Sequence, residues 1–300
     1  MKWLYYMSTS KVVVVNVRMP PYLTRRRGQL IINTWHAGGA YKRTGKNPNQ
    51  PKEVFGYSEE QRRRWINLMI SSSEKFTESN IYEGMHYHGE ILKCGMPRND
   101  IFFSDDQVRC ASAKVRSLYG GQEAMVVLYA PTFRGDVGEK SKIQSIPPFK
   151  DIASVLKKRF NRDVVILVRK HHHDYFDYCF ESNVHDVSNY PDMQELLCCA
   201  DILITDYSSS MWDYALLGRP CFLYVPDLKQ YEKEDRGFFT PVEKWPGIIC
   251  RDNNELIYEI ENVDCERSKE IAKKHLKYMG SYERGEACRR ITNRIIDVTD

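Results

Sequence analysis

The chain has 300 residues, of which 42% are hydrophobic and 28% are charged, a composition typical of a folded globular protein long enough for two domains. Aromatic residues make up 12%, and the lack of a long polar tract argues against extensive disorder. The 44 basic and 40 acidic residues leave a net charge of +4, which is too small an excess to indicate a nucleic-acid-binding protein.

Cysteine usage and hydropathy bear on the cellular location. The nine cysteines are scattered, odd in number and without two C-x-x-C pairs at metal-binding spacing, which favours reduced thiols in a cytosolic protein. No apolar run approaches the roughly 20 residues that cross a bilayer, and residues 1–10 are a poor signal peptide. We therefore expect a cytoplasmic protein that, if it works at a membrane, lies on its surface.

The first third of the chain contains short apolar runs of the kind that form buried parallel strands. These runs lie at residues 12–15, 29–34 and 90–94. Residues 58–71 are expected to form a helix, because Trp65, Leu68 and Met69 fall on one side of a helical projection. A further helix is expected at 105–119, where Gly120 and Gly121 provide a C-terminal stop.

The same alternation restarts after the glycine pair. Strands are expected at 125–129, 164–168, 201–205 and 221–225, and helices at 151–160, 192–200 and 211–217. From about residue 253 the sequence is mostly helical and charged. Strands that alternate with helices predict an α/β protein of two doubly wound, parallel-sheet halves with a cleft between them. We place the domains at 1–122 and 123–300, with a short N-terminal half.

Unusual polar residues follow four of the predicted strands. They are His36, Thr132 to Arg134, Arg169 to His171, and Asp206 to Ser210. Ligands of parallel α/β sheets bind beyond the carboxyl ends of the strands. Four strand ends that converge on one cleft indicate a site more strongly than any single motif.

Asp206-Tyr207-Ser208-Ser209-Ser210 follows a strand and opens a helix. The serines could simply cap the helix. Alternatively, Ser208, Ser209 and the free backbone N–H groups could bind a diphosphate, because helix N-termini attract anions. Asp206 would suit a hydroxyl donor such as a ribose, or would orient a nearby base.

Three consecutive histidines, 171–173, follow Arg169 and Lys170. Neighbouring side chains on an extended chain point in opposite directions, so the three histidines are poorly placed to chelate one metal ion. One histidine beside Arg169 fits phosphate binding or protonation of a leaving group better. Surface histidines on a loop remain the alternative.

His36 stands at a strand end before Gly38 and Gly39. Glycines let the backbone approach a ligand closely, and a histidine can act as a general base near neutral pH. Taken alone the motif is weak, because a single histidine is more often structural.

Five segments carry a family resemblance. They are NTWHAGGAYKRTG (33–45), CGMPRND (94–100), APTFRGD (130–136), VRKH (168–171) and DILITDYSSSMWDYALLGRPCFLYVPDLKQYEKEDRGFF (201–239). Together they resemble the CDP-glycerol glycerophosphotransferase family of teichoic-acid and capsule synthesis, and the last segment is the most specific. The resemblance covers roughly residues 5–250, and the remaining tail is generic.

The resemblance implies a GT-B-like fold, with the acceptor on the N-terminal half and a CDP-alditol donor on the C-terminal half. It implies that two histidines, matched by His36 and His171, are catalytic. It also implies that Thr132, Arg134, Asp206, Ser209 and Arg236 contact the donor. Arg169 and Ser208, the phosphate-binding candidates at the strand ends, complete the predicted donor site.

Two departures from the family pattern stand out. Many members have W-H-G-T-P where this chain has Ala37-Gly38-Gly39-Ala40, which leaves the acceptor and the subfamily open. Members also usually have more sequence before the strand at 12–15. We therefore expect either a compact member or a chain without the first units of its N-terminal sheet.

The predicted reaction moves glycerol phosphate, or a related alditol phosphate, from a CDP-activated donor to a hydroxyl of a lipid-linked polymer and releases CMP. No cofactor, protein-bound metal or nucleic-acid partner is expected. The predicted location is the inner face of the cell membrane, with basic clusters at 25–27 and 62–64 near anionic lipid. A GT-B nucleotide-sugar glycosyltransferase and a non-catalytic polymer-binding module are the alternatives.

Overall fold

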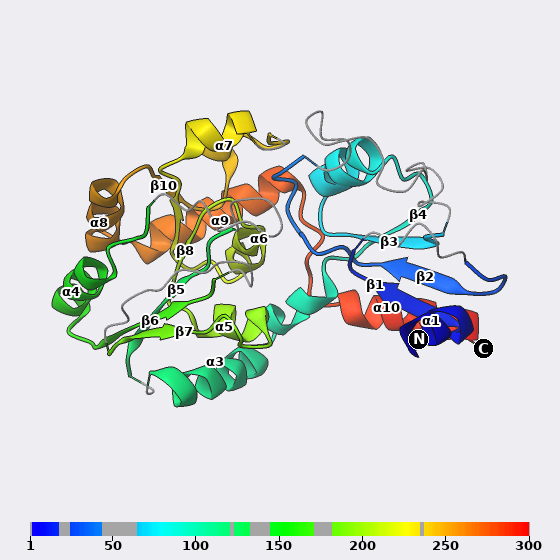
Figure 1. Ribbon diagram of the computed structural model, residues 1–300, viewed down its shortest axis with the longest axis horizontal. Coiled ribbons are helices and arrows are strands. Elements are labelled where there is room, and N and C mark those ends of the chain that lie inside the picture. Colours follow the sequence, from blue (N-terminus) through cyan, green and yellow to red (C-terminus); the bar gives the residue numbers. More distant parts are fainter. Residues whose placement is uncertain are drawn as a thin grey trace. The chain divides into compact units, whose positions relative to one another are not determined.

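The computed structural model describes residues 2–17, 25–43, 65–120, 123–132, 145–170, 182–234 and 237–299. The chain forms two compact units (Figure 1). Unit 1 comprises Met1–Phe103, Arg236–Phe239 and Tyr278–Asp300, and unit 2 comprises Ser104–Asp235 and Thr240–Lys277. These units differ from a single division at residue 122, because the helix at 105–119 belongs to unit 2 and the C-terminal end of the chain returns to unit 1.

Unit 1 is built on a four-stranded parallel sheet with the strand order β1-β2-β3-β4. Its strands are β1 (Val12–Val15), β2 (Leu30–Asn33), β3 (Leu68–Ser71) and β4 (Glu90–Lys93). Its helices are α1 (Lys2–Thr9), the π-helix η1 (Phe76–Gly84), the 3-10 helix η2 (Pro97–Phe103) and α10 (Ala287–Thr299). Both central strands are buried along their whole length, as expected of parallel strands covered on two faces.

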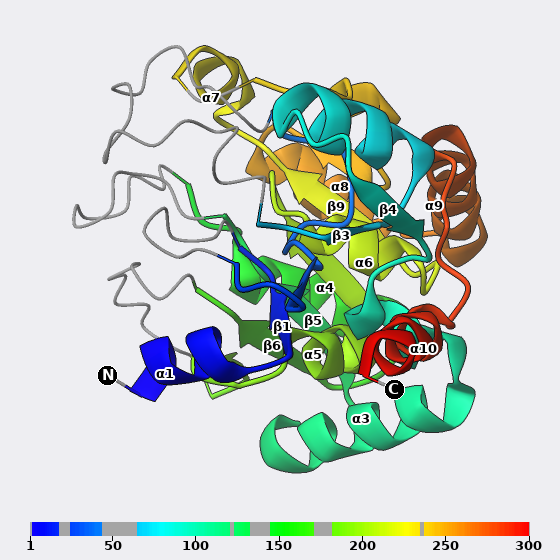
Figure 2. The ribbon, with the colours of Figure 1, turned by 90° about the vertical axis from the view of Figure 1, so that its right-hand side faces the viewer.

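The C-terminal helix α10 is part of the unit 1 core. Its residues Ala287 and Ile291 pack against the face of the sheet formed by Leu30 and Ile32. At its N-terminus the Asp100 carboxylate accepts the backbone N–H groups of Ala287 and Cys288, at 3.0 and 2.7 Å, where the helix dipole favours a negative charge. Figures 1 and 2 both show α10 beside η2.

A second acidic residue holds the returning chain. Glu283 is 2% exposed and accepts hydrogen bonds from the backbone N–H of Met96, at 3.0 Å, and from the Asn99 amide, at 3.2 Å. The segment CGMPRND therefore docks the C-terminal part of the chain onto unit 1. The tail that looked generic in the sequence completes the first unit.

Unit 2 is built on a six-stranded parallel sheet with the order β10-β9-β8-β5-β6-β7. The strands are β5 (Met125–Tyr129), β6 (Val164–Val168), β7 (Val184–Asp186), β8 (Ile202–Thr205), β9 (Cys221–Tyr224) and β10 (Ile248–Cys250). Numbered along this unit, the order is 3-2-1-4-5-6, the arrangement of dinucleotide-binding sheets. The strand order reverses between β5 and β8, so the carboxyl ends of these two strands form the switch point where ligands of such sheets bind.

Helices cover both faces of the unit 2 sheet. They are α3 (Asp105–Tyr119), α4 (Phe149–Phe160), α5 (Met193–Cys199), α6 (Ser210–Ala215), α7 (Leu228–Glu234), α8 (Asn253–Glu261) and α9 (Cys265–Met279), with the 3-10 turn η3 (Val242–Lys244). Alternate residues of β5, such as Val127 and Tyr129, share one core with Ile152 of α4 and Leu256 of α8. On the opposite face α5 and α6 contact the strands, and α3 packs on α5.

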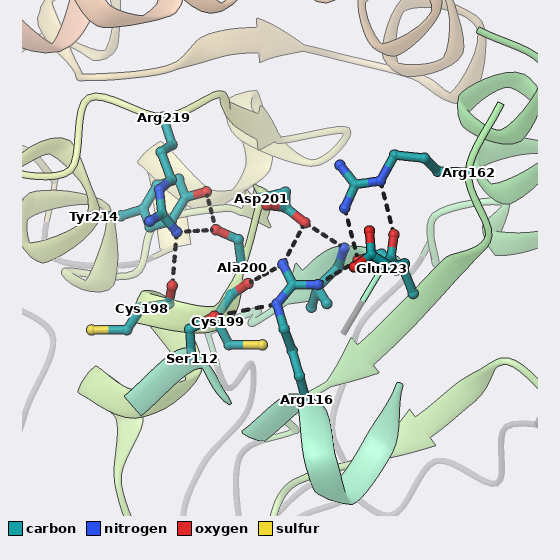
Figure 3. Close-up of polar contacts among 12 residues, drawn as sticks. Ser112, Arg116, Glu123, Arg162, Cys198, Cys199, Ala200, Asp201, Tyr214 and Arg219 are labelled. Atoms are coloured by element: carbon teal, nitrogen blue, oxygen red, sulfur yellow. Dashed lines mark hydrogen bonds and ion pairs between the residues drawn. The ribbon is translucent and has the colours of Figure 1, made fainter. Parts of the chain in front are cut away.

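A network of hydrogen bonds connects α3 to the amino-terminal edge of this sheet (Figure 3). Arg116 of α3 donates to the carbonyls of Ala124 and Cys199 and to the Asp201 carboxylate, which lies at 2.9 Å. Asp201 also accepts the backbone N–H of Val126 at 2.8 Å. A buried arginine with this many acceptors ties α3 to the starts of β5 and β8. It lies at the edge opposite the switch point.

Most strands predicted from the sequence are confirmed, including residues 12–15, 125–129 and 164–168 with identical bounds. The helix predicted at 58–71 is wrong at its C-terminal end, because Leu68–Ser71 forms the buried strand β3 and residues 58–64 lie outside the described part. The strands β7 and β10, three residues long each, have no counterpart among the predicted strands. No helix in the described part of the chain is long and apolar enough to span a membrane.

Candidate functional site

His36 lies on the turn that follows β2 in unit 1. Its imidazole is exposed, packs at 4.5 Å from the Trp35 ring centroid, and lies with Nδ1 3.1 Å from the carbonyl oxygen of Asn16. A carbonyl oxygen can only accept a hydrogen bond, so in the neutral ring Nδ1 carries the proton and Nε2 carries the lone pair. This is the tautomer that a general base needs if Nε2 is to take a proton.

The loop after His36 is held by the segment that follows β3. The Ser72 hydroxyl donates to the carbonyl of Gly38, and the Asn80 amide donates to the carbonyl of Lys42 at 3.5 Å. A Cβ on Gly39 would lie 2.1 Å from the Tyr41 ring, so this position excludes larger residues. The nearby serines, Ser72 among them, are fully buried, and nothing in the sequence pattern identified them as supports of the loop.

The RGF turn pairs with the same loop. The backbone N–H of Arg43 donates to the carbonyl of Gly237 at 3.0 Å, and the N–H of Phe239 donates to the carbonyl of Tyr41 at 2.8 Å. The Arg43 guanidinium lies 5.2 Å from the centre of the Phe239 ring. Gly237 and Phe239 therefore belong to unit 1 and not to the C-terminal half, and Arg236 lies outside the described residues.

In unit 2, the two loops at the switch point are bonded to one another. The Asp206 carboxylate, 2% exposed, accepts the backbone N–H of Thr132 through both oxygens, at 2.8 and 3.0 Å. The buried Thr205 hydroxyl, one residue before Asp206, donates to the carbonyl of Ala130, two residues before Thr132, at 2.7 Å. Asp206 thus fixes the position of Thr132 where the strand order reverses.

The serines after Asp206 have different surroundings. The Ser208 hydroxyl accepts the backbone N–H of Ser210, at 3.3 Å, and the Ser210 hydroxyl, at 3.0 Å. Ser209 is the N-cap residue of α6, is half-buried, and makes no side-chain capping bond in the described part of the chain. The Ser208 hydroxyl therefore has the structural, capping-type role expected from the sequence. The Ser209 hydroxyl makes no capping bond and can bind a ligand.

Arg169 follows β6, next to β5 in the sheet. Its Nη1 atom is buried and has no hydrogen-bond partner among the described residues. Burial lowers the pKa of the Arg169 guanidinium, and the negative charge of Asp192 opposes that shift. An arginine keeps its charge in proteins, so a buried donor of this kind calls for an anionic acceptor. The neighbouring Lys170, by contrast, is paired with Asp186 at 2.7 Å.

Three predicted site residues, His171, Arg134 and Arg236, lie outside the described residues. The described ones fall into two groups, His36 in unit 1 and Thr132, Arg169, Asp206, Ser208 and Ser209 in unit 2. Within the described ranges no three His, Cys, Asp or Glu side chains come together as metal ligands, and His172 and His173 lie outside those ranges.

One supporting cluster was not anticipated. Tyr207, buried between the site residues Asp206 and Ser208, donates its hydroxyl to Asp227 at 2.9 Å and stacks on Tyr231 of α7 at 3.8 Å. Its ring also meets Trp245 edge-on. Tyr207 thus anchors the loop that carries Asp206 and Ser208 to the segments after β9. The sequence gives no signal for this cluster beyond the aromatic residue in the motif.

Two parallel α/β units, the second with the strand order of a dinucleotide-binding sheet, define a GT-B-like protein. A family model described as CDP-Glycerol:Poly(glycerophosphate) glycerophosphotransferase matches residues 1–297. The chain belongs to this family and is a glycerophosphotransferase. The match extends past the region of about 5–250 expected from the motifs, in agreement with the docking of α10 on unit 1.

Curated relatives act in teichoic-acid synthesis. The chain is 31% identical to a teichoic acid glycerol-phosphate transferase of Staphylococcus aureus, over 98% of this chain and 78% of the relative. It is 34% identical to a teichoic acid poly(glycerol phosphate) polymerase of Staphylococcus epidermidis, over 87% of this chain and 38% of that longer protein. A teichoic acid ribitol-phosphate primase of Bacillus spizizenii is 30% identical, over 86% of this chain and 68% of the relative.

Solved structures agree with the fold. The wall teichoic acid polymerase TagF superposes with a TM-score of 0.78 at 28% identity, covering 96% of this chain and 73% of that one. A variant of TagF soaked with CDPG gives the same TM-score at 30% identity and the same coverage. A UDP-N-acetylglucosamine 2-epimerase, at 14% identity and a TM-score of 0.53 over 98% and 74% of the two chains, shares the fold alone.

Proposed function

We propose that this chain transfers glycerol phosphate from CDP-glycerol to the hydroxyl end of a lipid-linked, teichoic-acid-type polymer and releases CMP. The main support is the environment of Arg169, which follows the carboxyl end of β6. Its guanidinium is charged, and its buried Nη1 atom lacks a hydrogen-bond partner among the described residues. A donor diphosphate supplies the acceptor oxygens that this group needs. We assign the nucleotide of the donor to unit 2 and the acceptor to unit 1.

In the proposed reaction an acceptor hydroxyl attacks the β-phosphorus of the donor. The new oxygen–phosphorus bond forms as the bond to CMP breaks, and CMP leaves with the bonding electrons. His36 takes the hydroxyl proton through Nε2, which the Nδ1 contact with Asn16 leaves unprotonated. His171 protonates or stabilises the departing CMP. Solved TagF variants replace two different histidines, which supports a pair of histidines in this chemistry.

Donor binding is mainly charge neutralisation and positioning, as in other phosphoryl-type transfers. We assign Arg169, Arg134 and Arg236 to the donor phosphates, together with the hydroxyls of Ser208 and Ser209. Asp206 acts by holding the Thr132 backbone at the switch point. Because its carboxylate already accepts this N–H, we assign its role to placing the loop around the nucleotide.

We propose glycerol over ribitol as the alditol. The family description and the Staphylococcus aureus transferase, which aligns with 98% of this chain at 31% identity, both specify glycerol phosphate. Ribitol-phosphate enzymes are nevertheless among the relatives at 30% identity. The test must therefore include both donors.

We place the enzyme at the cytoplasmic face of a membrane, where a lipid-linked acceptor would lie. Arg25 and Arg27 are exposed and available to anionic lipid head groups. Arg26 serves the fold instead, because its guanidinium donates to the carbonyls of Ser8, Thr9 and Ser10 at the C-terminus of α1. Arginines 62–64 lie outside the described residues. Only part of the six-arginine surface expected from the sequence is thus assigned to the membrane.

Incubation of the protein with a defined lipid-linked acceptor tests the proposal. Parallel reactions receive CDP-glycerol, CDP-ribitol or a UDP-sugar, and nucleotide release and product mass are followed. We expect acceptor-dependent CMP release with CDP-glycerol and products heavier by glycerol phosphate units. UDP release would favour the glycosyltransferase alternative, and binding of the acceptor without any turnover would favour a non-catalytic module.

A further inference from the structure

Asn33 is the last residue of β2 and stands three residues before His36. It is 1% exposed and pairs in register with Val15, the last residue of β1. A buried amide side chain at the carboxyl edge of a sheet must find hydrogen-bond partners, because an unsatisfied one destabilises the fold. The hydrogen-bond partners of Asn33 show which segments it connects.

The two ends of the Asn33 amide bind two different loops. Oδ1 accepts the backbone N–H of Trp35 at 2.7 Å, and Nδ2 donates to the carbonyl of Val17 at 3.1 Å. The reversed amide would set donor against donor and acceptor against acceptor, so this orientation is the one that satisfies both ends. Asn33 therefore bridges the turn after β2 and the segment after β1.

The two residues that Asn33 binds are the sequence neighbours of His36 and of its hydrogen-bond partner Asn16. Trp35 precedes His36, and Val17 follows Asn16, whose carbonyl lies 3.1 Å from His36 Nδ1. Trp35 also has a φ of 55°, in the left-handed region that a bulky residue rarely adopts. The Asn33 Oδ1 atom accepts the N–H of Trp35 in this conformation, and the ring of the next residue, His36, lies against the Asn16 carbonyl.

We infer that Asn33 is a positioning residue that sets the tautomer of His36 for catalysis, an inference that rests on the proposed role of His36 as the base. The amide aligns the Asn16 carbonyl with His36 Nδ1, and this contact keeps the proton on Nδ1 and the lone pair on Nε2. Without Asn33 the two loops lose their common anchor. The ring can then take either tautomer, and one of the two cannot accept the hydroxyl proton through Nε2.

The test combines ¹⁵N spectra of the histidine rings with steady-state kinetics. The His36 signals are assigned with His36→Gln, in the full chain without ligand. Asn33→Ala should lower the fraction of the Nδ1-protonated tautomer and reduce kcat roughly 10- to 100-fold, less than complete loss of a base. KM for CDP-glycerol should stay within about twofold, because Asn33 has no donor contact in the proposal.

Two further variants keep the test decisive. Asn33→Asp retains the acceptor for Trp35 but loses the donor to Val17, so it should fold and still disturb the tautomer should Asn33→Ala fail to fold. Asn67→Ala is the matched control, because Asn67 also bonds β2 through its side chain, accepting the Ile31 N–H at 2.8 Å, but away from His36. It should leave the His36 tautomer and kcat unchanged.

The outcomes separate the inference from the proposed function. An unchanged tautomer in the folded Asn33 variants overturns the inference, whether or not the rate falls. A changed tautomer with an unchanged rate supports the positioning by Asn33 and removes His36 as the base. A changed tautomer with a reduced kcat and an unchanged KM supports both.

Discussion

The Asp206 carboxylate binds the backbone N–H of Thr132 with both oxygens, at 2.8 and 3.0 Å, across the two strands between which the sheet order of unit 2 reverses. The two residues are 74 positions apart in the chain. Ligands of doubly wound sheets bind at such a reversal. The contact therefore joins the two loops on which the proposed donor site depends.

Replacement of Asp206 should separate its structural task from its charge. Asp206→Ala leaves the Thr132 N–H without this acceptor and should lower the free energy of unfolding by about 1–3 kcal/mol. Asp206→Asn keeps an oxygen acceptor and should remain within roughly 1 kcal/mol of the unchanged protein. Urea unfolding of the three proteins measures the difference. Equal losses in both variants would contradict a role for the hydrogen bond.

Loss of the Arg169 charge should weaken donor binding. Hydrogen bonds to charged groups contribute about 1.5–3 kcal/mol, so Arg169→Gln should raise the dissociation constant of CDP-glycerol roughly 10- to 100-fold. Calorimetric titration measures this. The matched control is Arg162→Gln, because Arg162 bonds the carbonyls of Glu123 and Ala124 at the opposite edge of the sheet. A similar affinity in both variants would remove Arg169 from the donor site.

The two serines of the D-Y-S-S motif should respond differently. Ser208→Ala removes the bonds to Ser210 and should destabilise the protein by about 0.5–2 kcal/mol, as for a lost helix cap. Ser209→Ala should leave the stability nearly unchanged and weaken CDP-glycerol binding. Thermal unfolding and titration of both variants check this. A destabilised Ser209→Ala with normal donor affinity would reverse the assignment.

His275 should make the stability depend on pH. Burial lowers the pKa of His275 to about 4, while its Nδ1 donates to the Lys244 carbonyl at 2.6 Å. Between about pH 6.5 and pH 4 the histidine is protonated in the unfolded chain but not in the folded chain. The free energy of unfolding should therefore fall by roughly 3 kcal/mol as the pH is lowered over this range. His275→Asn keeps a donor for Lys244 and should lose this part of the dependence. The same acid slope in the variant would assign it to other groups.

The sequence reveals those parts of the fold that local patterns encode. Val164–Val168 is a continuous apolar run and forms a strand with the predicted bounds. Leu68–Ser71 is also buried throughout, but its spacing from Trp65 imitates a helix. The strand β10 has only three residues, too few to show the hydrophobic pattern of a strand in the sequence.

Contacts between residues far apart in the chain account for the features that the sequence does not predict. Glu283 binds the backbone of Met96, 187 residues earlier in the chain, and no local pattern predicts such a contact. The same holds within the site. His36 and Asp206 are recognisable in the sequence as polar residues at strand ends. Asn33, Ser72 and Tyr207 are not, because they act through the backbone or through other side chains.

The most direct test of the account is CMP release from CDP-glycerol by the unchanged protein and by His36→Ala and His171→Ala, at saturating donor with a lipid-linked acceptor. We expect acceptor-dependent release and products extended by glycerol phosphate. Each variant should be about 10²–10⁴-fold slower, with an unchanged affinity for CDP-glycerol. The absence of release by the unchanged protein would contradict the reaction, and near-full turnover in either variant would contradict the role of that histidine.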